Sequence, residues 1–237
     1  MRNSLSASVL SVIIIAVLSL LLYISFEIYA YSKTFSEIIT LIESLVIIVV
    51  GLALINKRLK EAVSPKNLAL SITFGVLLYA AQWAIAYVPA FVWYTPPFSY
   101  FATALFVYLP EGIIVSVLLV LTESAYGSLF MMIIPFYIIS MISFFNPVWT
   151  PFYFSMASLA EIVIFAGKRE YMTAALASIV FSATDAFLAS QFMLFNFGVY
   201  QPPVIQLSSV FIDIIFSIFG AFLGLAIGKK AKTAWRP

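Results

Sequence analysis

The sequence predicts an all-α membrane protein, a polytopic bundle of about eight transmembrane helices with both termini in the cytoplasm. Of its 237 residues, 64% are hydrophobic and only 9% are charged, and the mean hydropathy is +1.11. A water-soluble domain could not cover that much apolar surface with so few polar groups. Apolar segments near the ~20 residues that cross a bilayer recur along the chain, and basic residues gather in alternate connections between them.

We expect eight spans. Their approximate ranges are 8–30, 36–56, 68–93, 101–122, 127–145, 151–167, 171–195 and 204–228. Turn-forming or polar stretches separate them, such as YTPPFSY at 94–100 and NPVWTP at 146–151. The sixth span is short and begins after Pro151, so it either tilts or pairs with the fifth as a re-entrant element.

The basic residues predict the orientation. If the spans alternate from a cytoplasmic N terminus, only Lys33 lies outside. The cytoplasmic set is Arg2, Lys57, Arg58, Lys60, Lys66, Lys168, Arg169, Lys229, Lys230, Lys232 and Arg236. The net charge of +2 is too small to indicate nucleic acid binding. We therefore expect the lipid bilayer of the cell (plasma) membrane as the surroundings of this chain.

Acidic residues inside the apolar segments are the main candidates for a polar site. Glu111, Asp185 and Asp213 fall near the middle of their spans, where a charge costs at least about 2.5 kcal/mol. No lysine or arginine lies deep enough to pair with them. Each is thus protonated and hydrogen-bonded to a neighbouring helix, or exposed to a wet cavity; alternatively, it only holds helices together. Glu43 lies outside the middle, and Glu161 lies toward the inner end.

The seventh span carries a small-residue edge beside one of these acids. The edge consists of Ala174, Ser178, Ser182, Ala186 and Ser190. Such an edge lets another helix approach closely, and Asp185 borders it and points into the bundle. Polar and aromatic side chains of other spans lie at compatible depths in the outer half of the membrane. The predicted ligand site consists of Gln82, Trp83, Glu111, Asp185 and Gln191.

Aromatic residues crowd the predicted outer ends and loops. They are Trp93, Tyr94, Phe98, Tyr100, Phe101, Phe144, Phe145, Trp149, Phe152, Tyr153, Phe154, Phe195, Phe197 and Tyr200. One interpretation is an interfacial aromatic belt. The other is that part of the set lines an outward-facing pocket for a flat or amphipathic ligand.

The sequence does not contain the motifs of common membrane enzymes. It has no cysteine and no histidine, which excludes thiolate nucleophiles, disulfides and His-based zinc or haem sites. It has no G-x-S-x-G, H-E-x-x-H or phosphate-binding loop. Asp185 and Asp213 are its only aspartates, so closely spaced magnesium ligands are missing. We expect no enzymatic activity and no cofactor.

Four stretches carry a family resemblance. They are KNLALSITFGVLLYAAQW at 66–83, VWYTPPFSYFATALFVYLPEGIIVSVLLVLTESAYGSLF at 92–130, SLAEIVIFAGKREYMTAALASIVFSA at 158–183 and FIDIIFSIFGAFLGLAIGKK at 211–230. In order, they look like the first helix, the outer loop with the second helix, the cytoplasmic turn and the last helix of the substrate-binding S component of energy-coupling-factor (ECF) transporters. The glycine-rich stretch that follows the family's second helix is reduced here to Gly127.

The resemblance divides the chain into two parts and implies a function. Residues 68–237 would form the six-helix substrate-binding bundle, and residues 1–67 an extra transmembrane hairpin with a basic cytoplasmic loop. Members of the family capture a vitamin-like micronutrient outside the cell. They deliver it through a transmembrane coupling protein that ABC-type ATPases drive. The alternative function is a structural or anchoring subunit of a larger membrane complex.

The last span has glycines at fourfold spacing, and these suggest a docking surface. Through the resemblance, the expected docking residues are Ala80, Ala84, Gly220, Gly224 and Gly228. A smooth face of this kind serves close helix packing, so the alternative is packing within the chain itself.

Overall fold

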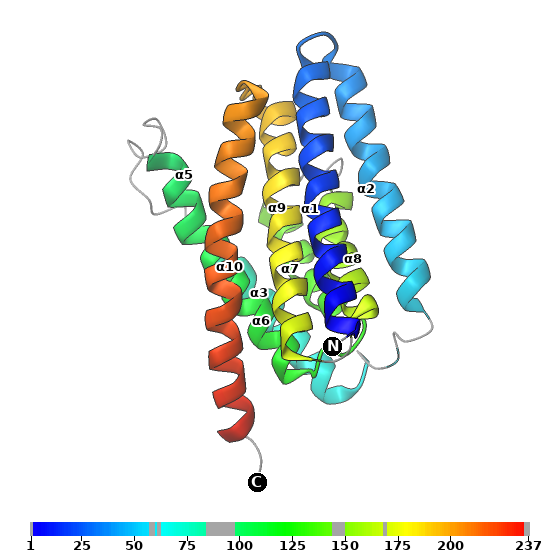
Figure 1. Cartoon of the computed structure of the whole chain (residues 1–237), viewed down its shortest axis with the longest axis vertical. Helices are drawn as coiled ribbons and strands as arrows, with labels where there is room; N and C mark the ends of the chain where they lie inside the picture. The colour runs from blue at the N-terminus through cyan, green and yellow to red at the C-terminus, as the bar shows by residue number, and fades with distance from the viewer. Residues whose placement is uncertain are drawn as a thin grey trace.

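The computed structural model describes residues 2–56, 60, 63–83, 98–143, 150–167 and 170–234. Seven helices are α1 (Arg2–Tyr29), α2 (Lys33–Ile55), α3 (Pro65–Trp83), α7 (Ser128–Ser143), α8 (Thr150–Ala166), α9 (Tyr171–Phe197) and α10 (Pro203–Ala234). The eighth runs without a break through α5 (Phe98–Thr103), the π-helical turn η3 (Ala104–Tyr108) and α6 (Leu109–Leu121). The described residues contain no strand, so the predicted all-α class is confirmed (Figure 1).

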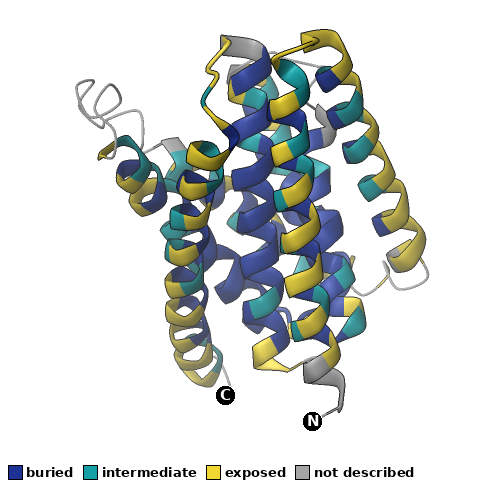
Figure 2. Cartoon of the chain, turned by 45° about the horizontal axis from the view of Figure 1, so that its top comes forward, coloured by how far each residue is buried: buried dark blue, intermediate teal, exposed yellow. Residues whose placement is uncertain are grey.

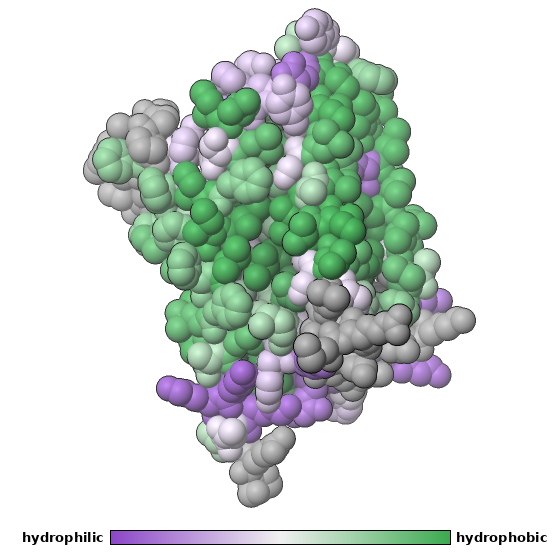
Figure 3. Space-filling model, in the orientation of Figure 1, coloured by the Kyte–Doolittle hydropathy of each residue, from purple (hydrophilic) through white to green (hydrophobic). Residues whose placement is uncertain are grey.

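The helices form a membrane bundle. Within the described residues, five helices are long and apolar enough to cross a bilayer: Ser6–Tyr29, Lys33–Leu54, Phe98–Leu121, Tyr171–Phe195 and Pro203–Ala234. The apolar parts of α7 and α8 are shorter, and the predicted continuation of the third span over 84–93 lies outside the described residues. Figure 3 shows a wide hydrophobic belt with hydrophilic residues gathered at the end where α10 finishes. The chain is therefore a helical membrane protein.

Both termini lie at one end of the bundle (Figure 1). The Ser6 hydroxyl donates to the Ala166 carbonyl oxygen at 3.1 Å, which joins the start of α1 to the end of α8. Lys232, near the end of α10, forms a 2.7 Å ion pair with Glu123 in the turn after α6. The start of α1, the ends of α8 and α10 and the turn after α6 thus lie at one end of the bundle, as they must if successive helices run in alternate directions.

The end of α1, the start of α5 and the α9–α10 connection lie at the opposite end of the bundle. Tyr29 stacks on Tyr200 with ring centroids 6.1 Å apart, which brings the end of α1 to the α9–α10 connection. The Tyr100 hydroxyl donates to the Gln201 side-chain oxygen at 3.0 Å and places the start of α5 there too. The alternation of helix directions in the described chain thus agrees with the predicted one. That this end faces outward stays a prediction.

The centre of the bundle is α9, which is buried along most of its length while much of α1 and α2 is exposed (Figure 2). The small-residue edge predicted in this span is buried, and α6 lies against it. The contact is close enough for the Ser178 hydroxyl to donate to the Gly112 carbonyl oxygen at 2.9 Å. The N-terminal hairpin packs on the other side, α1 against α9 and α2 against α8.

The glycine edge of α10 packs inside the chain. Gly220, Gly224 and Gly228 are buried against α6, where a Cβ on Gly224 would lie 2.5 Å from the Ile113 carbonyl oxygen. A Cβ on Gly228 would lie 2.9 Å from Val120 Cβ. The described residues thus show the glycines packed within the chain, with α6 on the face that a partner would need.

Candidate ligand-binding site

The π-helical turn η3 lies beside a candidate site in the middle of the bundle. Pro110 has no N–H to donate to the carbonyl four residues earlier, and its ring would clash there. The preceding turn opens into η3, in which the Leu109 N–H reaches back five residues to the Ala104 carbonyl oxygen. Single π-helical turns of this kind occur often at functional sites. The turn ends at Tyr108, which lines a cavity, and α6 then places Glu111 in its first turn, fully buried.

Three predicted site residues meet at the floor of this region. The Gln82 side-chain amide of α3 donates to Glu111 Oε2 of α6 at 3.1 Å and to Asp185 Oδ2 of α9 at 3.4 Å. The Gln82 amide therefore brings the two carboxyls together and joins α3, α6 and α9 in the middle of the bundle.

A cavity of about 370 Å³ opens above this network. Its lining consists of Gln82, Thr103, Val107, Tyr108, Phe152, Tyr153, Asp185, Ala189, Phe192 and Met193. Phe152 lies in the first turn of α8, and Met193 lies near the end of α9, so the cavity occupies the half of the bundle nearest the α9–α10 connection. Its volume falls in the range of small-molecule sites, about 300–1,000 Å³.

The charged residues at the site are all acidic. Among the residues that the structure describes, the cavity lining contains Asp185 and no lysine or arginine, and Glu111 lies directly behind it. Asp213 of α10 is buried close enough to interact electrostatically with Asp185 and with the Tyr108 ring. In the described part of the chain, no group of three or more acidic side chains could hold a metal ion. The arrangement is suited to a ligand that presents hydrogen-bond donors or a positive charge.

Gln191 does not join the site. Its side-chain amide donates to the Ser25 hydroxyl of α1 at 3.0 Å, and it also hydrogen-bonds to Glu43 of α2. Six residues at about 100° each turn Gln191 away from the face of α9 that carries Asp185. Gln191 therefore does not line this cavity, because equal depth does not place two side chains on the same face; that it binds a ligand stays a prediction.

Other predicted residues have separate placements. Glu161 Oε1 accepts the Leu129 N–H at 3.0 Å at the start of α7, where a carboxyl satisfies an otherwise unpaired helix N–H. Ala80 is exposed on α3, so its docking role stays a prediction. The side chain of Trp83 and all of Ala84 lie outside the described residues.

The aromatic residues of the predicted outer end have several environments. Phe152 and Tyr153 line the cavity, whereas Phe195 and Tyr200 pack on Tyr29 of α1. Phe101 and Phe154 pack on other rings, those of Phe216 and Tyr137. Trp93, Tyr94, Phe144, Phe145 and Trp149 of the predicted rim lie outside the described residues.

Two aromatic residues that line the cavity were not predicted from the sequence. Tyr108 could have been predicted from its position, because it lies just before Pro110 and Glu111 in the middle of a span. Phe192 could have been predicted too, because a residue seven positions after Asp185 returns to the same helix face.

Comparisons with protein-family models, curated proteins and solved structures found no match. The function must therefore be argued from the cavity, its charge and the resemblance noted in the sequence.

Proposed function

We propose that this protein is a membrane-embedded component that captures a small molecule for uptake. The observation that carries the proposal is the cavity, which combines a hydrogen-bonded acidic floor with aromatic walls inside a helical membrane bundle. Pockets that are mostly apolar, with a few converging polar groups, are typical of small-molecule sites. A bundle held together only by polar contacts has no need of an open space beside them.

The proposed ligand is small, carries hydrogen-bond donors or a positive charge, and has a flat or amphipathic body. The charge preference follows from Asp185, which lines the cavity with no basic residue beside it. The preference for a flat body follows from Phe152, Tyr153 and Phe192, since aromatic rings offer a large contact area with few rotors to immobilise. A vitamin-like micronutrient has these properties.

The resemblance to ECF S components supports the second half of the proposal. In this reading the chain works with a transmembrane coupling protein and ABC-type ATPases in the plasma membrane. Because α6 covers the glycine edge of α10, the docking surface would lie on α3, where Ala80 is exposed. A small exposed residue allows another helix to approach closely.

Gentle purification in lipid, followed by mass spectrometry of bound small molecules, tests the capture function. Once a ligand is found, Asp185→Asn should weaken its binding by about 1.5–3 kcal/mol, the contribution of a hydrogen bond to a charged group. Glu27→Gln is the control, since Glu27 is exposed on α1 and does not line the cavity. If nothing is retained, and no small cation raises the thermal stability, the structural-subunit alternative replaces capture.

Co-purification tests the partner. The variant Ala80→Leu should reduce recovery of an endogenous coupling protein while leaving ligand binding intact. Ala53→Leu places the same side chain on the exposed face of α2 and should change neither. Equal recovery with both variants would remove α3 as the docking surface.

A further inference from the structure

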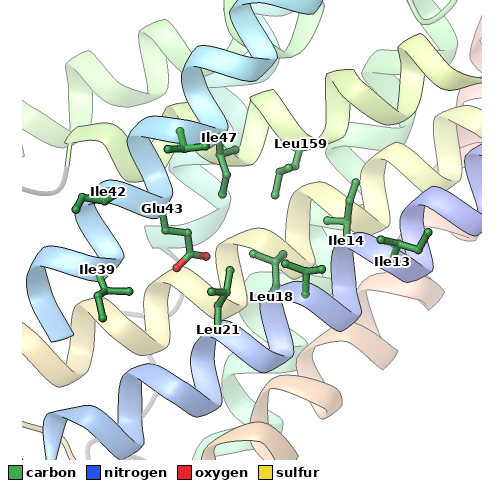
Figure 4. Close-up of a pocket in the computed structure, with 11 residues that line it drawn as sticks. Ile13, Ile14, Leu18, Leu21, Ile39, Ile42, Glu43, Ile47 and Leu159 are labelled. Carbon is green, nitrogen blue, oxygen red and sulfur yellow. The ribbon is translucent and has the colours of Figure 1, made fainter.

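A second pocket lies in the N-terminal hairpin, outside the six-helix region that carries the resemblance. It is a groove of about 440 Å³ between α1 and α2, with Leu159 of α8 on its inner side (Figure 4). Ten of its eleven lining residues are isoleucine, leucine or valine. Val17 and Val46 are about half exposed, so the groove opens toward the surrounding lipid. The groove is therefore accessible from the membrane.

Glu43 is the one polar side chain among the described residues that line the groove. In Figure 4 it extends from α2 toward the space beside Leu21 of α1. Glu43 hydrogen-bonds to Gln191 of α9, but its Oε2 is buried without a hydrogen-bond partner among the described residues. A buried acceptor with no partner destabilises the fold, and a donor in the groove would remove that cost.

The depth of Glu43 restricts what can supply the donor. It lies ten residues after the start of α2 at Lys33, or about 15 Å along the helix at ~1.5 Å per residue, which places it inside a ~30 Å hydrocarbon layer and below the headgroups. Phospholipid headgroups stay at the surface, and their acyl chains carry no donor. No lysine or arginine of the described chain lines the groove. The donor must therefore belong to a molecule that is itself dissolved in the bilayer.

We propose that the α1–α2 groove binds a lipophilic molecule, a hydrocarbon chain that ends in an amine or hydroxyl group, with the chain against the isoleucines and leucines and the donor on Glu43 Oε2. The volume of the groove is that of a small-molecule site, whereas a bare lipid tail would leave the acceptor unsatisfied. This site is separate from the cavity at Asp185, because α9 presents Gln191 to Glu43 from a different face.

Carbodiimide labelling of the whole protein in lipid nanodiscs tests the proposal. Dicyclohexylcarbodiimide dissolves in the bilayer and reacts with carboxylic acids there. The acid O–H adds across one C=N bond, and the acyl group then moves to nitrogen to leave a stable N-acylurea. The extent of reaction at Glu43 is read by peptide mass spectrometry. Dodecylamine and 1-dodecanol should each slow labelling of Glu43 several-fold, whereas dodecane should not.

Two variants test whether the protection arises in the groove. Val17→Trp fills the groove and should abolish protection, while Val12→Trp, on the exposed side of α1 outside the lining, should leave it unchanged. The proposal is overturned if Glu43 is labelled only after unfolding, as a covering helix or second copy would cause, or if dodecane protects as well as dodecylamine.

Discussion

The helices α9 and α2 show opposite relations between composition and burial. In the most apolar stretch of α9, 83% of the residues are buried, although α9 is the least apolar of the five candidate spans in the described chain. The corresponding stretch of α2 is more apolar, yet only 17% of it is buried. In a soluble protein the more apolar helix would lie inside. Here the less apolar helix does, and Figure 2 shows the exposed residues on the outer helices.

The difference follows from the solvent. Lipid tails are as apolar as leucine, so an apolar side chain gains little by leaving them. Polar side chains such as Ser178 and Asp185 have no partner in lipid and find one only between helices. Small residues add to the effect, because they let backbones approach and increase dispersion contacts. Burial in this protein therefore follows polarity and small size more than hydrophobicity.

The largest effect is expected where a large side chain enters the closest helix contact. Gly224→Leu should separate α10 from α6 and cost about 1–3 kcal/mol or more, because the new Cβ alone would lie 2.8 Å from Ser116 Cβ. Thermal unfolding in detergent measures it. Ala226→Leu makes a comparable change two residues away on the exposed side and should be nearly silent. Equal stability of the two variants would refute the packing of α10 on α6.

A smaller loss is expected from the polar network. Gln82→Leu removes the donor shared by Glu111 and Asp185, and unsatisfied buried acceptors cost about 1–3 kcal/mol. Thr73→Val on the same helix is the control, because its hydroxyl is exposed and bonds only within α3. Steric trapping measures the free energy of unfolding of both variants. If Gln82→Leu is as stable as the control, the hydrogen bonds of Gln82 do not hold α3 to the bundle.

A single hydroxyl on the small-residue edge of α9 should matter less. Ser178→Ala removes the hydrogen bond to the Gly112 carbonyl oxygen. Measured hydrogen bonds between membrane helices contribute about 0.6 kcal/mol on average and at most ~1.7 kcal/mol, so we expect a loss of stability in this range. Ser208→Ala removes an exposed hydroxyl that bonds within its own helix and serves as the reference. A loss well above this range would mean that Ser178 has a role beyond one hydrogen bond.

The smallest loss of stability is expected on the exposed face of α2. Val49 of α2 is exposed to lipid, so Val49→Ala exchanges one apolar surface for another. We expect the free energy of unfolding to change by less than about 0.5 kcal/mol. A loss as large as that of Gly224→Leu would show that this face of α2 is covered in the native membrane.

The sequence predicted part of the candidate site, and its limits have a physical cause. Depth along a helix follows from residue number, so Gln82, Glu111 and Asp185 could be placed at one level before their contacts were known. Helix rotation does not follow from depth. Depth therefore grouped Gln191 with side chains from which it points away, and Phe192, its neighbour in sequence, was not predicted to line the cavity.

The sequence by itself determined that this chain is a helical membrane protein, where most helices begin and end, and which carboxyls have no basic partner in hydrocarbon. These properties depend on composition and on local hydrogen bonding, since every backbone group in lipid must be satisfied within its own helix. Only the tertiary structure decided that the glycines of α10 face α6, that Glu43 and Asp185 belong to different pockets, and that α9 is central. Those properties depend on which helix faces meet. In a bilayer that choice rests on close packing and polar pairing, because hydrophobic surface does not distinguish a neighbouring helix from lipid.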